Sequence, residues 1–232
     1  SAEALVRWQH PEKGMIPPGI FIPLFERNGY ISVLDRYIWD KVCAMLKRRR
    51  EQNLDVVPIS MNVSRVDFYS HSLCDDIIKI VEKYGLEPQL LRLEVTESSY
   101  SDNPQTVMET VKKLQDYGFT IMMDDFGSGY SSLNTLKDLP VDILKIDMKF
   151  MDDLDKGGKS AIILESIVRM TKWMSLRAVA EGVETEDELN FLKSIECNYI
   201  QGYYFYRPMP EKDFEELLNK PDLVDVRSAA VT

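Results

Sequence analysis

The chain has 232 residues, of which 44% are hydrophobic, and its 38 acidic against 28 basic residues give a formal net charge of −10. This length is enough for one large domain with a substantial core, and barrels of alternating strands and helices commonly reach it undivided. The acidic balance excludes a protein that holds a nucleic-acid backbone by bulk charge, so no DNA or RNA polymer is expected as a partner.

Short apolar runs alternate along the chain with segments of helical period. Strands are predicted at residues 3–8, 57–64, 91–97, 120–127, 142–147, 177–184 and 199–205. Six helices are predicted from apolar residues at helical spacing and from helix start and stop signals. Two of them contain the apolar residues Leu34, Ile38, Val42, Met45 and Leu46, and Ile163, Ile167, Met170 and Trp173, respectively. The other four lie at residues 73–84 before Gly85, from Pro104 to Gly118, after Thr185, and after Pro210. Repeated strand–helix alternation indicates parallel strands covered by helices, and a TIM-type (β/α) barrel is favoured over a doubly wound open sheet.

The predicted strands number seven, whereas a closed barrel of this type has eight. The first run begins within three residues of the start of the chain. We therefore expect the opening strand of the barrel to be missing, and the strands with Glu3 and Gln201 to flank the seam. Residues 1–220 form the predicted domain, and residues 221–232 have no helical period and are expected to be a tail.

Two further features of the sequence indicate the cellular compartment of the protein. The cysteines, Cys43, Cys74 and Cys197, are widely spaced and odd in number, which predicts reduced, mostly packed thiols in the cytoplasm and no disulfide frame. In addition, no apolar run is long enough to span a bilayer and no signal peptide is visible.

Each predicted strand carries a polar residue near one of its ends. These residues are Glu3, Asn62, Glu94, Asp124 with Asp125, Lys145, Glu181 and Gln201. In a parallel barrel these ends meet at one mouth, where five carboxylates could not all stay ionised without cations. Oxygen donors favour Mg²⁺, Mn²⁺ or Ca²⁺ over zinc. Because adjacent strand residues point to opposite faces, Asp125 is expected where the strand begins to turn, with freedom supplied by Gly127 and Gly129.

Several stretches resemble, in order, the motifs of the EAL-domain family, the bacterial cyclic di-GMP phosphodiesterases. They are EALVRW, SMNVS, LEVTES, DDFGSGYSSL, LKID, AEGVE and QGYYFYRP, and the resemblance covers essentially residues 2 to 218. The run around Asp124 is highly specific, whereas LKID or AEGVE alone would be weak. Ser128 and Met61 stand where threonine and valine are common, and the family's usual first helix and antiparallel strand are missing.

The resemblance also implies roles for individual residues. Glu3, Asn62, Glu94 and Asp124 would bind one metal ion, and Asp124, Asp125 and Glu181 the second. Lys145 would contact the nucleophilic water, Glu181 could be ligand or proton acceptor, and Glu97 would anchor the glycine loop after Asp125. Substrate binding would fall to Arg7, which meets a phosphate, to Gln201, and to the polar positions Asp147 and Glu184.

The implied reaction is hydrolysis of cyclic di-GMP to linear pGpG by a water activated by two Mg²⁺ or Mn²⁺ ions, with Ca²⁺ binding but inhibiting. The implied partners are a second copy of the chain and an upstream sensory or GGDEF domain. Two alternatives stay open: a domain that binds cyclic di-GMP or a protein without turnover, and an unrelated Mg²⁺ barrel enzyme acting on a sugar phosphate or an enolate.

Overall fold

The computed structural model describes residues 1–126, 136, 140–147 and 158–220. The chain forms two compact units, Ser1–Ile121 and Met122–Thr232, here called the N-terminal unit and the C-terminal unit. Gly127, Ser128 and Gly129, together with the predicted tail at 221–232, lie outside the described residues.

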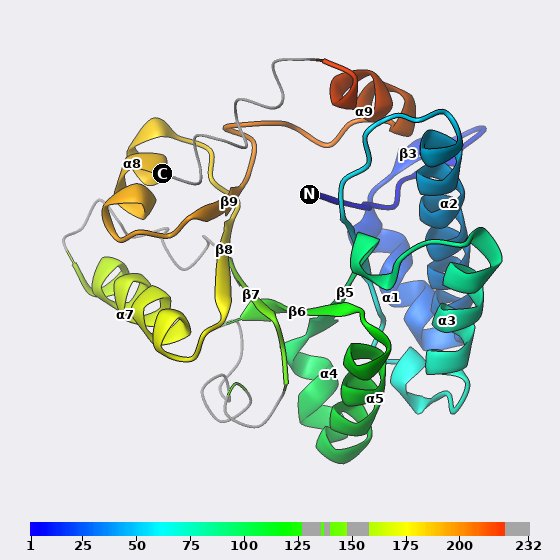
Figure 1. Ribbon diagram of the computed structural model, residues 1–232, viewed down its shortest axis with the longest axis horizontal. Coiled ribbons are helices and arrows are strands. Elements are labelled where there is room, and N and C mark those ends of the chain that lie inside the picture. Colours follow the sequence, from blue (N-terminus) through cyan, green and yellow to red (C-terminus); the bar gives the residue numbers. More distant parts are fainter. Residues whose placement is uncertain (127–135, 137–139, 148–157, 221–232) are drawn as a thin grey trace. The chain divides into compact units, whose positions relative to one another are not determined.

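The N-terminal unit contains a parallel sheet covered by helices. Its strands β1 (Ala2–Glu3), β4 (Ile59–Asn62) and β5 (Leu91–Thr96) pair in that order. The helices are α1 (Pro18–Asn28), α2 (Ile31–Glu51), α3 (Leu73–Tyr84), α4 (Glu97–Asp102) and α5 (Pro104–Tyr117), with short 3-10 helices η1 (Asp67–Tyr69) and η2 (Pro88–Leu90). Helices α2 and α3 lie side by side on one side of the strands (Figure 1).

The C-terminal unit continues the same alternation. Strand β6 (Thr120–Phe126) spans the boundary between the units and is followed in the sheet by β7 (Ile143–Asp147), β8 (Arg177–Glu181) and β9 (Tyr199–Gln201), all parallel. The helices described here are α7 (Lys159–Trp173), α8 (Glu186–Ser194) and α9 (Glu211–Leu218). Every one of the seven predicted runs thus contains a parallel strand.

The predicted helix ends are confirmed at three places. Gly85 and Gly118 follow α3 and α5 with φ angles of 61° and 115°, the left-handed conformation that glycine adopts without strain. Thr185 precedes α8 in a capping box, in which its side chain accepts the Glu188 N–H and the Glu188 carboxylate accepts the Thr185 N–H. The expected edges also hold: in the described part of the chain β1 pairs only with β4, and β9 only with β8.

The predicted strand at residues 3–8 is wrong in its extent. The parallel strand ends at Glu3, and Trp8 begins an antiparallel hairpin of β2 (Trp8–His10) and β3 (Gly14–Ile16). In the turn, His10 Nδ1 accepts the N–H groups of Glu12 and Lys13. The Trp8 ring packs against aromatic rings of α1, which explains why an apolar run here does not continue the parallel strand.

Other predicted strands are shorter than expected at their carboxyl ends. Strand β8 stops at Glu181, before Gly182 with its φ of 82°, and β9 stops at Gln201. Strand β5 stops at Thr96, so Glu97 opens helix α4, which the sequence analysis did not predict. Helix α1, with Pro18 in its first turn, was also not predicted.

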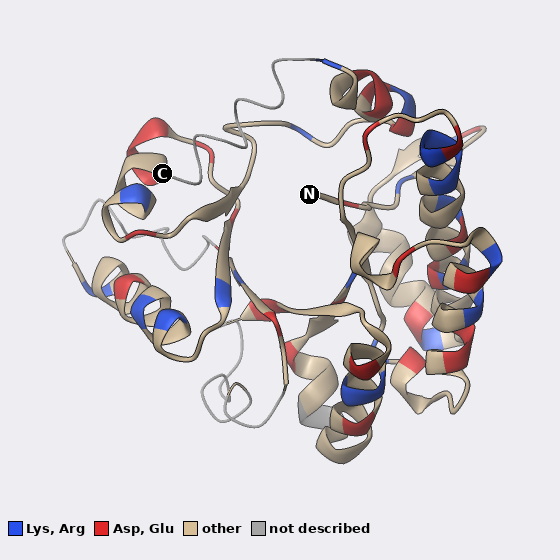
Figure 2. Ribbon diagram, viewed as in Figure 1, with Lys and Arg blue, Asp and Glu red and all other residues tan. Residues whose placement is uncertain are grey.

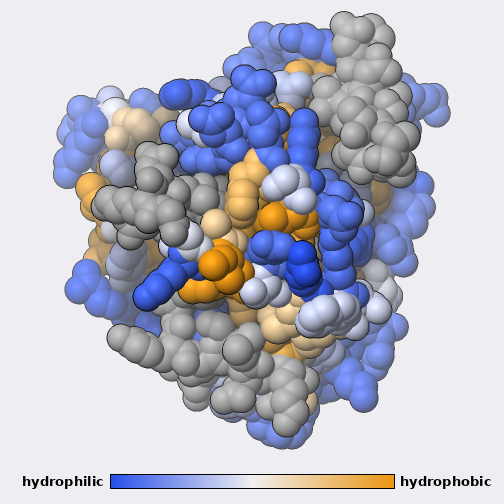
Figure 3. Space-filling model, turned by 90° about the vertical axis from the view of Figure 1, so that its left-hand side faces the viewer, coloured by the Kyte–Doolittle hydropathy of each residue, from blue (hydrophilic) through white to orange (hydrophobic). Residues whose placement is uncertain are grey.

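Helix α7 is present as predicted, but the apolar residues from which it was predicted do not form its buried face. The buried residues are Leu164, Val168 and Thr171, whereas Ile163 is exposed and Trp173 is 84% exposed. Two apolar stripes run along this helix, so spacing alone does not decide which of them faces the sheet. On the side of the molecule that bears α7 and α8, hydrophobic residues are visible among hydrophilic ones (Figure 3).

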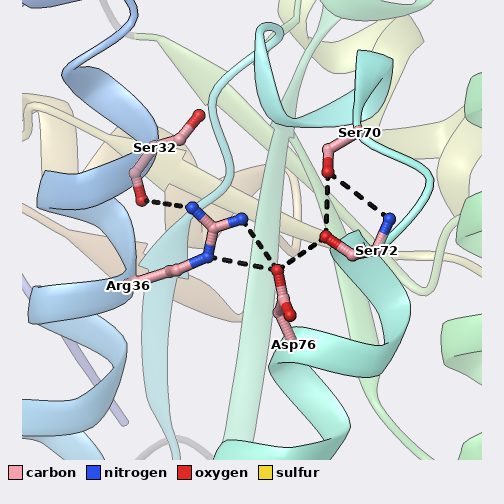
Figure 4. Close-up of polar contacts among 5 residues, drawn as sticks. All are labelled: Ser32, Arg36, Ser70, Ser72 and Asp76. Atoms are coloured by element: carbon pink, nitrogen blue, oxygen red, sulfur yellow. Dashed lines mark hydrogen bonds and ion pairs between the residues drawn. The ribbon is translucent and has the colours of Figure 1, made fainter.

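Helices α2 and α3 are joined by a polar network as well as by apolar packing. Arg36 of α2 donates from Nε and Nη2 to Asp76 Oδ2 of α3, over 3.1 and 2.7 Å, and from Nη1 to the Ser32 carbonyl (Figure 4). Ser72 donates to the same Asp76 oxygen. This ion pair links α2 to α3, and α2 in turn contacts β4.

The cysteines are free thiols, as predicted. Cys43 and Cys197 are buried and Cys74 is half-buried. Burial raises the pKa of all three thiols, that of Cys43 to about 12, so they remain protonated at neutral pH.

The described helices differ from membrane-spanning helices in their combination of length and apolar character, and they carry charges of both signs. None of them is long and apolar enough to cross a bilayer. Acidic and basic residues are intermixed along α2 and α3 (Figure 2).

Candidate active site at the carboxyl ends of the strands

In the N-terminal unit, the three predicted metal ligands share one face of the sheet. Glu3 pairs in register with Ser60, and Asn62 pairs with Glu94. Since alternate residues of a strand point to the same side, Ser60 and Asn62 face together, and so do Glu3 and Glu94. The Glu94 side chain is buried, whereas Asn62 is exposed at the end of its strand.

Two other predicted residues of this unit lie beyond the strand ends. Arg7 is exposed between β1 and the hairpin, and its Nη1 donates to the Val6 carbonyl over 2.8 Å. Glu97 is buried at the start of α4. Its expected partner, the glycine loop after Asp125, lies outside the described residues, so the anchoring role stays a prediction.

In the C-terminal unit, Asp124 and Asp125 occupy an irregular part of β6. The register against β7 shifts between Met123 and Phe126, and Asp125 has a φ of 55°. The Asp125 N–H donates to Asp124 Oδ1 over 2.9 Å. A bulge with a left-handed aspartate breaks the alternation of a regular strand. The strand thus turns at Asp125, as predicted, whereas Gly127 and Gly129 lie outside the described residues.

Lys145 lies between two of the predicted ligands. Its Nζ is 3.1 Å from Asp124 Oδ1 and 2.9 Å from Glu181 Oε1, and the side chain is only 2% exposed. Two acidic side chains thus face one lysine at this point. The convergence of three residues from β6, β7 and β8 confirms that polar strand ends meet within this unit.

Three further predicted residues lie close to this group along the sheet. Asp147, Glu181 and Gln201 pair in register across β7, β8 and β9. Glu184 instead belongs to the connection before α8, where it is exposed and its N–H donates to Glu188 over 2.8 Å. The backbone of Glu184 therefore completes the helix start, while its side chain is available to solvent.

Gly202, which the sequence analysis did not single out, fixes the end of β9. A Cβ at this position would lie 2.1 Å from the Val183 carbonyl oxygen and 2.3 Å from the Val183 nitrogen. Backbone hydrogen bonds from Val183 to Gln201 and from Tyr204 to Val183 hold the two segments together. Only glycine permits this approach, which sets the position of Gln201.

Replacing Gly202 by alanine is expected to lower the free energy of unfolding by about 3 kcal/mol or more, because backbone on both sides must move. Urea unfolding followed by circular dichroism measures this change. The matched control is Gly19→Ala in α1, where no atom lies within 4 Å of the added Cβ. A Gly202→Ala protein as stable as the control would contradict the close approach.

The donor chemistry suits a hard cation. The predicted ligands offer carboxylate and amide oxygens, which Mg²⁺, Mn²⁺ and Ca²⁺ prefer. Among the residues that the structure describes, no three His, Cys, Asp or Glu side chains stand together in cation-binding geometry. The residues thus fit a cation by type and by their excess negative charge around Lys145.

Helix α2 contributes buried polar groups that the sequence analysis did not identify. Trp39 Nε1 donates to the Asn62 carbonyl over 3.0 Å, and Asp35 Oδ2 accepts the Ser64 N–H over 3.2 Å. The buried face of α2 includes Ile31, Asp35 and Trp39. Their spacing of four residues was a readable signal, since it places an aspartate on an apolar face.

A parallel α/β fold with oxygen donors and a buried lysine at its strand ends defines a class of barrel-type proteins suited to binding hard cations. The EAL domain profile matches residues 1–208. The chain therefore belongs to the EAL domain family.

Individual relatives agree with this assignment. The cyclic di-GMP phosphodiesterase NbdA of Pseudomonas aeruginosa is 37% identical over 216 residues, 93% of this chain and 28% of NbdA. MucR of the same species, a bifunctional diguanylate cyclase/cyclic di-GMP phosphodiesterase, is 38% identical over 90% of this chain and 30% of MucR. The chain thus spans less than a third of these relatives.

A solved structure confirms the fold class. The PaMucR phosphodiesterase in its c-di-GMP complex is 38% identical, with a TM-score of 0.85 over 91% of this chain and 86% of that one. The predicted class, a TIM-type α/β barrel of the EAL variety, is therefore correct.

Proposed function

We propose that this chain hydrolyses one phosphodiester bond of cyclic di-GMP and releases linear pGpG. The observation on which this rests is the group of Lys145, Asp124 and Glu181, which meets at the strand ends of an EAL domain. Relatives named as cyclic di-GMP phosphodiesterases, and a likeness to one in complex with c-di-GMP, support this choice of substrate.

Two divalent cations, Mg²⁺ or Mn²⁺, are proposed as cofactors. Glu3, Asn62, Glu94 and Asp124 would hold one, and Asp124, Asp125 and Glu181 the other. Bound cations of this kind polarise a phosphoryl oxygen and lower the pKa of water. We expect Ca²⁺ to bind to the same oxygens without supporting turnover.

The remaining residues would orient the reactants. Lys145, held by two carboxylates, presents a buried ammonium that can orient the attacking water or stabilise negative charge. Arg7 would neutralise a substrate phosphate. Gln201, in register with Glu181, would contact the substrate near the reacting phosphorus, with Asp147 and Glu184 lining the approach. Glu181 would act as ligand or proton acceptor, and Glu97 would anchor the loop after Asp125.

The proposed setting extends beyond the described residues. Residues 1–220 would form the catalytic domain and 221–232 a tail. A second copy of the chain and an upstream sensory or GGDEF domain would be its protein partners, in the cytoplasm. The bifunctional name of MucR and the small share of each relative that the chain spans support a multidomain context.

A turnover assay separates hydrolysis from binding without turnover. The native chain is incubated with cyclic di-GMP in Mg²⁺ or Mn²⁺, with and without EDTA, and nucleotides are resolved by chromatography. We expect pGpG to accumulate and EDTA to stop it. Binding measured in Ca²⁺, together with unchanged nucleotide in both Mg²⁺ and Mn²⁺, would instead identify a binding module.

A further inference from the structure

Two side chains of α2 hold the backbone that follows β4. Asp35 and Trp39 are four residues apart, so they lie on the same face of the helix, and both are buried. Trp39 Nε1 donates to the Asn62 carbonyl and Asp35 Oδ2 accepts the Ser64 N–H. The chain is thus fixed on either side of Val63, whose own N–H donates to the Glu94 carbonyl.

A second buried carboxyl group faces Asp35. Asp67, at the start of η1, is 1% exposed, and its backbone N–H donates to the Ser64 carbonyl over 2.9 Å. The carboxyl groups of Asp35 and Asp67 lie within reach of a hydrogen bond, and Asp67 Oδ2 is buried with no other hydrogen-bond partner among the described residues. Two carboxyl groups this close can form a hydrogen bond only if one of them keeps a proton, and two buried carboxylates without one would repel each other.

The surroundings favour retention of that proton at neutral pH. Burial, the hydrogen bond to Asp67 and the charge of Asp67 raise the pKa of Asp35 to about 8. Glu26 of α1 acts in the same direction, whereas the Ser64 N–H acts in the opposite one. The groups facing Asp35 from the neighbouring elements are therefore Glu26 and Asp67, both acidic.

We propose that Asp35 is a positioning residue that shares one proton with Asp67 and so holds Asn62 at the end of β4. The link to Asn62 runs through the Ser64 N–H, two residues further along the chain, and is reinforced by Trp39. The role of Asn62 as a cation ligand rests on the proposed function, whereas the shared proton does not. Ionisation of both carboxyl groups would separate them and release the Ser64 N–H.

The pH dependence of unfolding has a definite sign. The pKa of Asp35 is raised in the folded chain, so between about pH 5 and pH 8 the folded state holds a proton that the unfolded state has lost. The stabilisation is fully present below the unfolded pKa and is lost as pH rises through 8. Within this window, each increase of one pH unit should raise the unfolding equilibrium constant of the native chain about tenfold relative to that of a variant without the proton.

Asp35→Asn tests the shared proton, because its amide can accept the Ser64 N–H and donate permanently to Asp67. The control is Asp40→Asn on the same helix, where a hydrogen bond from Lys83 lowers the pKa and keeps Asp40 charged. In urea unfolding from pH 5 to pH 9.5, the ratio of native to variant unfolding constants should change about tenfold per pH unit up to pH 8 for Asp35→Asn, and should stay constant for Asp40→Asn. A constant ratio of native to Asp35→Asn unfolding constants would overturn the proposal. If Asp35→Asn does not fold, Asp67→Asn tests the same proton from the other side.

Cation affinity tests the positioning role. Mg²⁺ affinity is measured by calorimetric titration at pH 7 and pH 9. Between these pH values, the affinity of the native chain should fall at least threefold relative to that of Asp35→Asn, and the affinity of Asp40→Asn should fall as much as that of the native chain. Equal ratios at both pH values would reduce Asp35 to a structural role and overturn the positioning claim. If neither the native chain nor any variant binds Mg²⁺, the proposed cation site is wrong, and the positioning role of Asp35 is wrong with it. If the native chain binds Mg²⁺ but its unfolding constant shows no pH dependence relative to Asp35→Asn, only the present inference is wrong.

Discussion

Replacing Asp124 by asparagine is expected to lower turnover of cyclic di-GMP by roughly 10²–10³-fold or more. Asp124 Oδ1 receives the Asp125 N–H and lies 3.1 Å from Lys145 Nζ, so this oxygen stands at the centre of the charged group. The amide has nearly the same shape but lacks the negative charge that a ligand of both cations would supply. Initial rates in Mg²⁺ measure the loss, and calorimetry should show weaker Mg²⁺ binding.

The control for Asp124→Asn is Asp116→Asn at the exposed end of α5. It removes the same charge from the chain, so it reports any effect of net charge alone. Its turnover should stay within about twofold of native, as is usual for surface substitutions. Near-normal turnover of Asp124→Asn in Mg²⁺ would show that the bridging role is assigned to the wrong residue.

Lys145→Met is expected to reduce turnover by roughly 10²-fold or more, with affinity for cyclic di-GMP in Ca²⁺ changed only a few-fold. Methionine keeps most of the buried alkyl volume and removes the ammonium. Without it, the carboxyl groups of Asp124 and Glu181 lose the cation that lies within 3.1 Å of both, which costs stability. Added Mg²⁺ should therefore stabilise Lys145→Met against urea more than it stabilises the native chain.

The control for Lys145→Met is Lys172→Met on α7, which removes a partly exposed lysine paired with Glu196. In Lys172→Met, both the turnover of cyclic di-GMP and the stabilisation by Mg²⁺ against urea should equal those of the native chain. If Lys145→Met loses affinity for cyclic di-GMP in proportion to turnover, Lys145 mainly binds the substrate, and its proposed role toward the attacking water is wrong.

The strand order could be predicted because each strand is a short apolar run bounded by turn residues. Parallel strands buried between layers read as continuous apolar segments, as Ile121–Met123 of β6 shows. The boundaries were less predictable. At Trp8 an apolar residue serves a hairpin that packs on α1, and at Glu97 a helix begins with no connecting loop. Neither contact is visible in local spacing.

The site could be predicted as far as strand ends define it. Lys145, Asp124 and Glu181 meet because parallel strands bring their carboxyl ends to one edge. The turn at Asp125 was predicted, but the shift in register was not, since it depends on pairing with β7. Asp35 was missed for a different reason: a carboxyl group on a buried helix face becomes meaningful only when its partner, Asp67, is known.

The isotope content of the product tests the central claim most directly. Cyclic di-GMP is incubated with the native chain and Mg²⁺ in water enriched in oxygen-18, and the nucleotides are analysed by mass spectrometry. Attack of water on phosphorus breaks one P–O3′ bond, so we predict pGpG with a single heavy oxygen in its terminal phosphate, and none with Asp124→Asn. Unchanged cyclic dinucleotide from the folded native chain, or pGpG without the label, would contradict hydrolysis at this site.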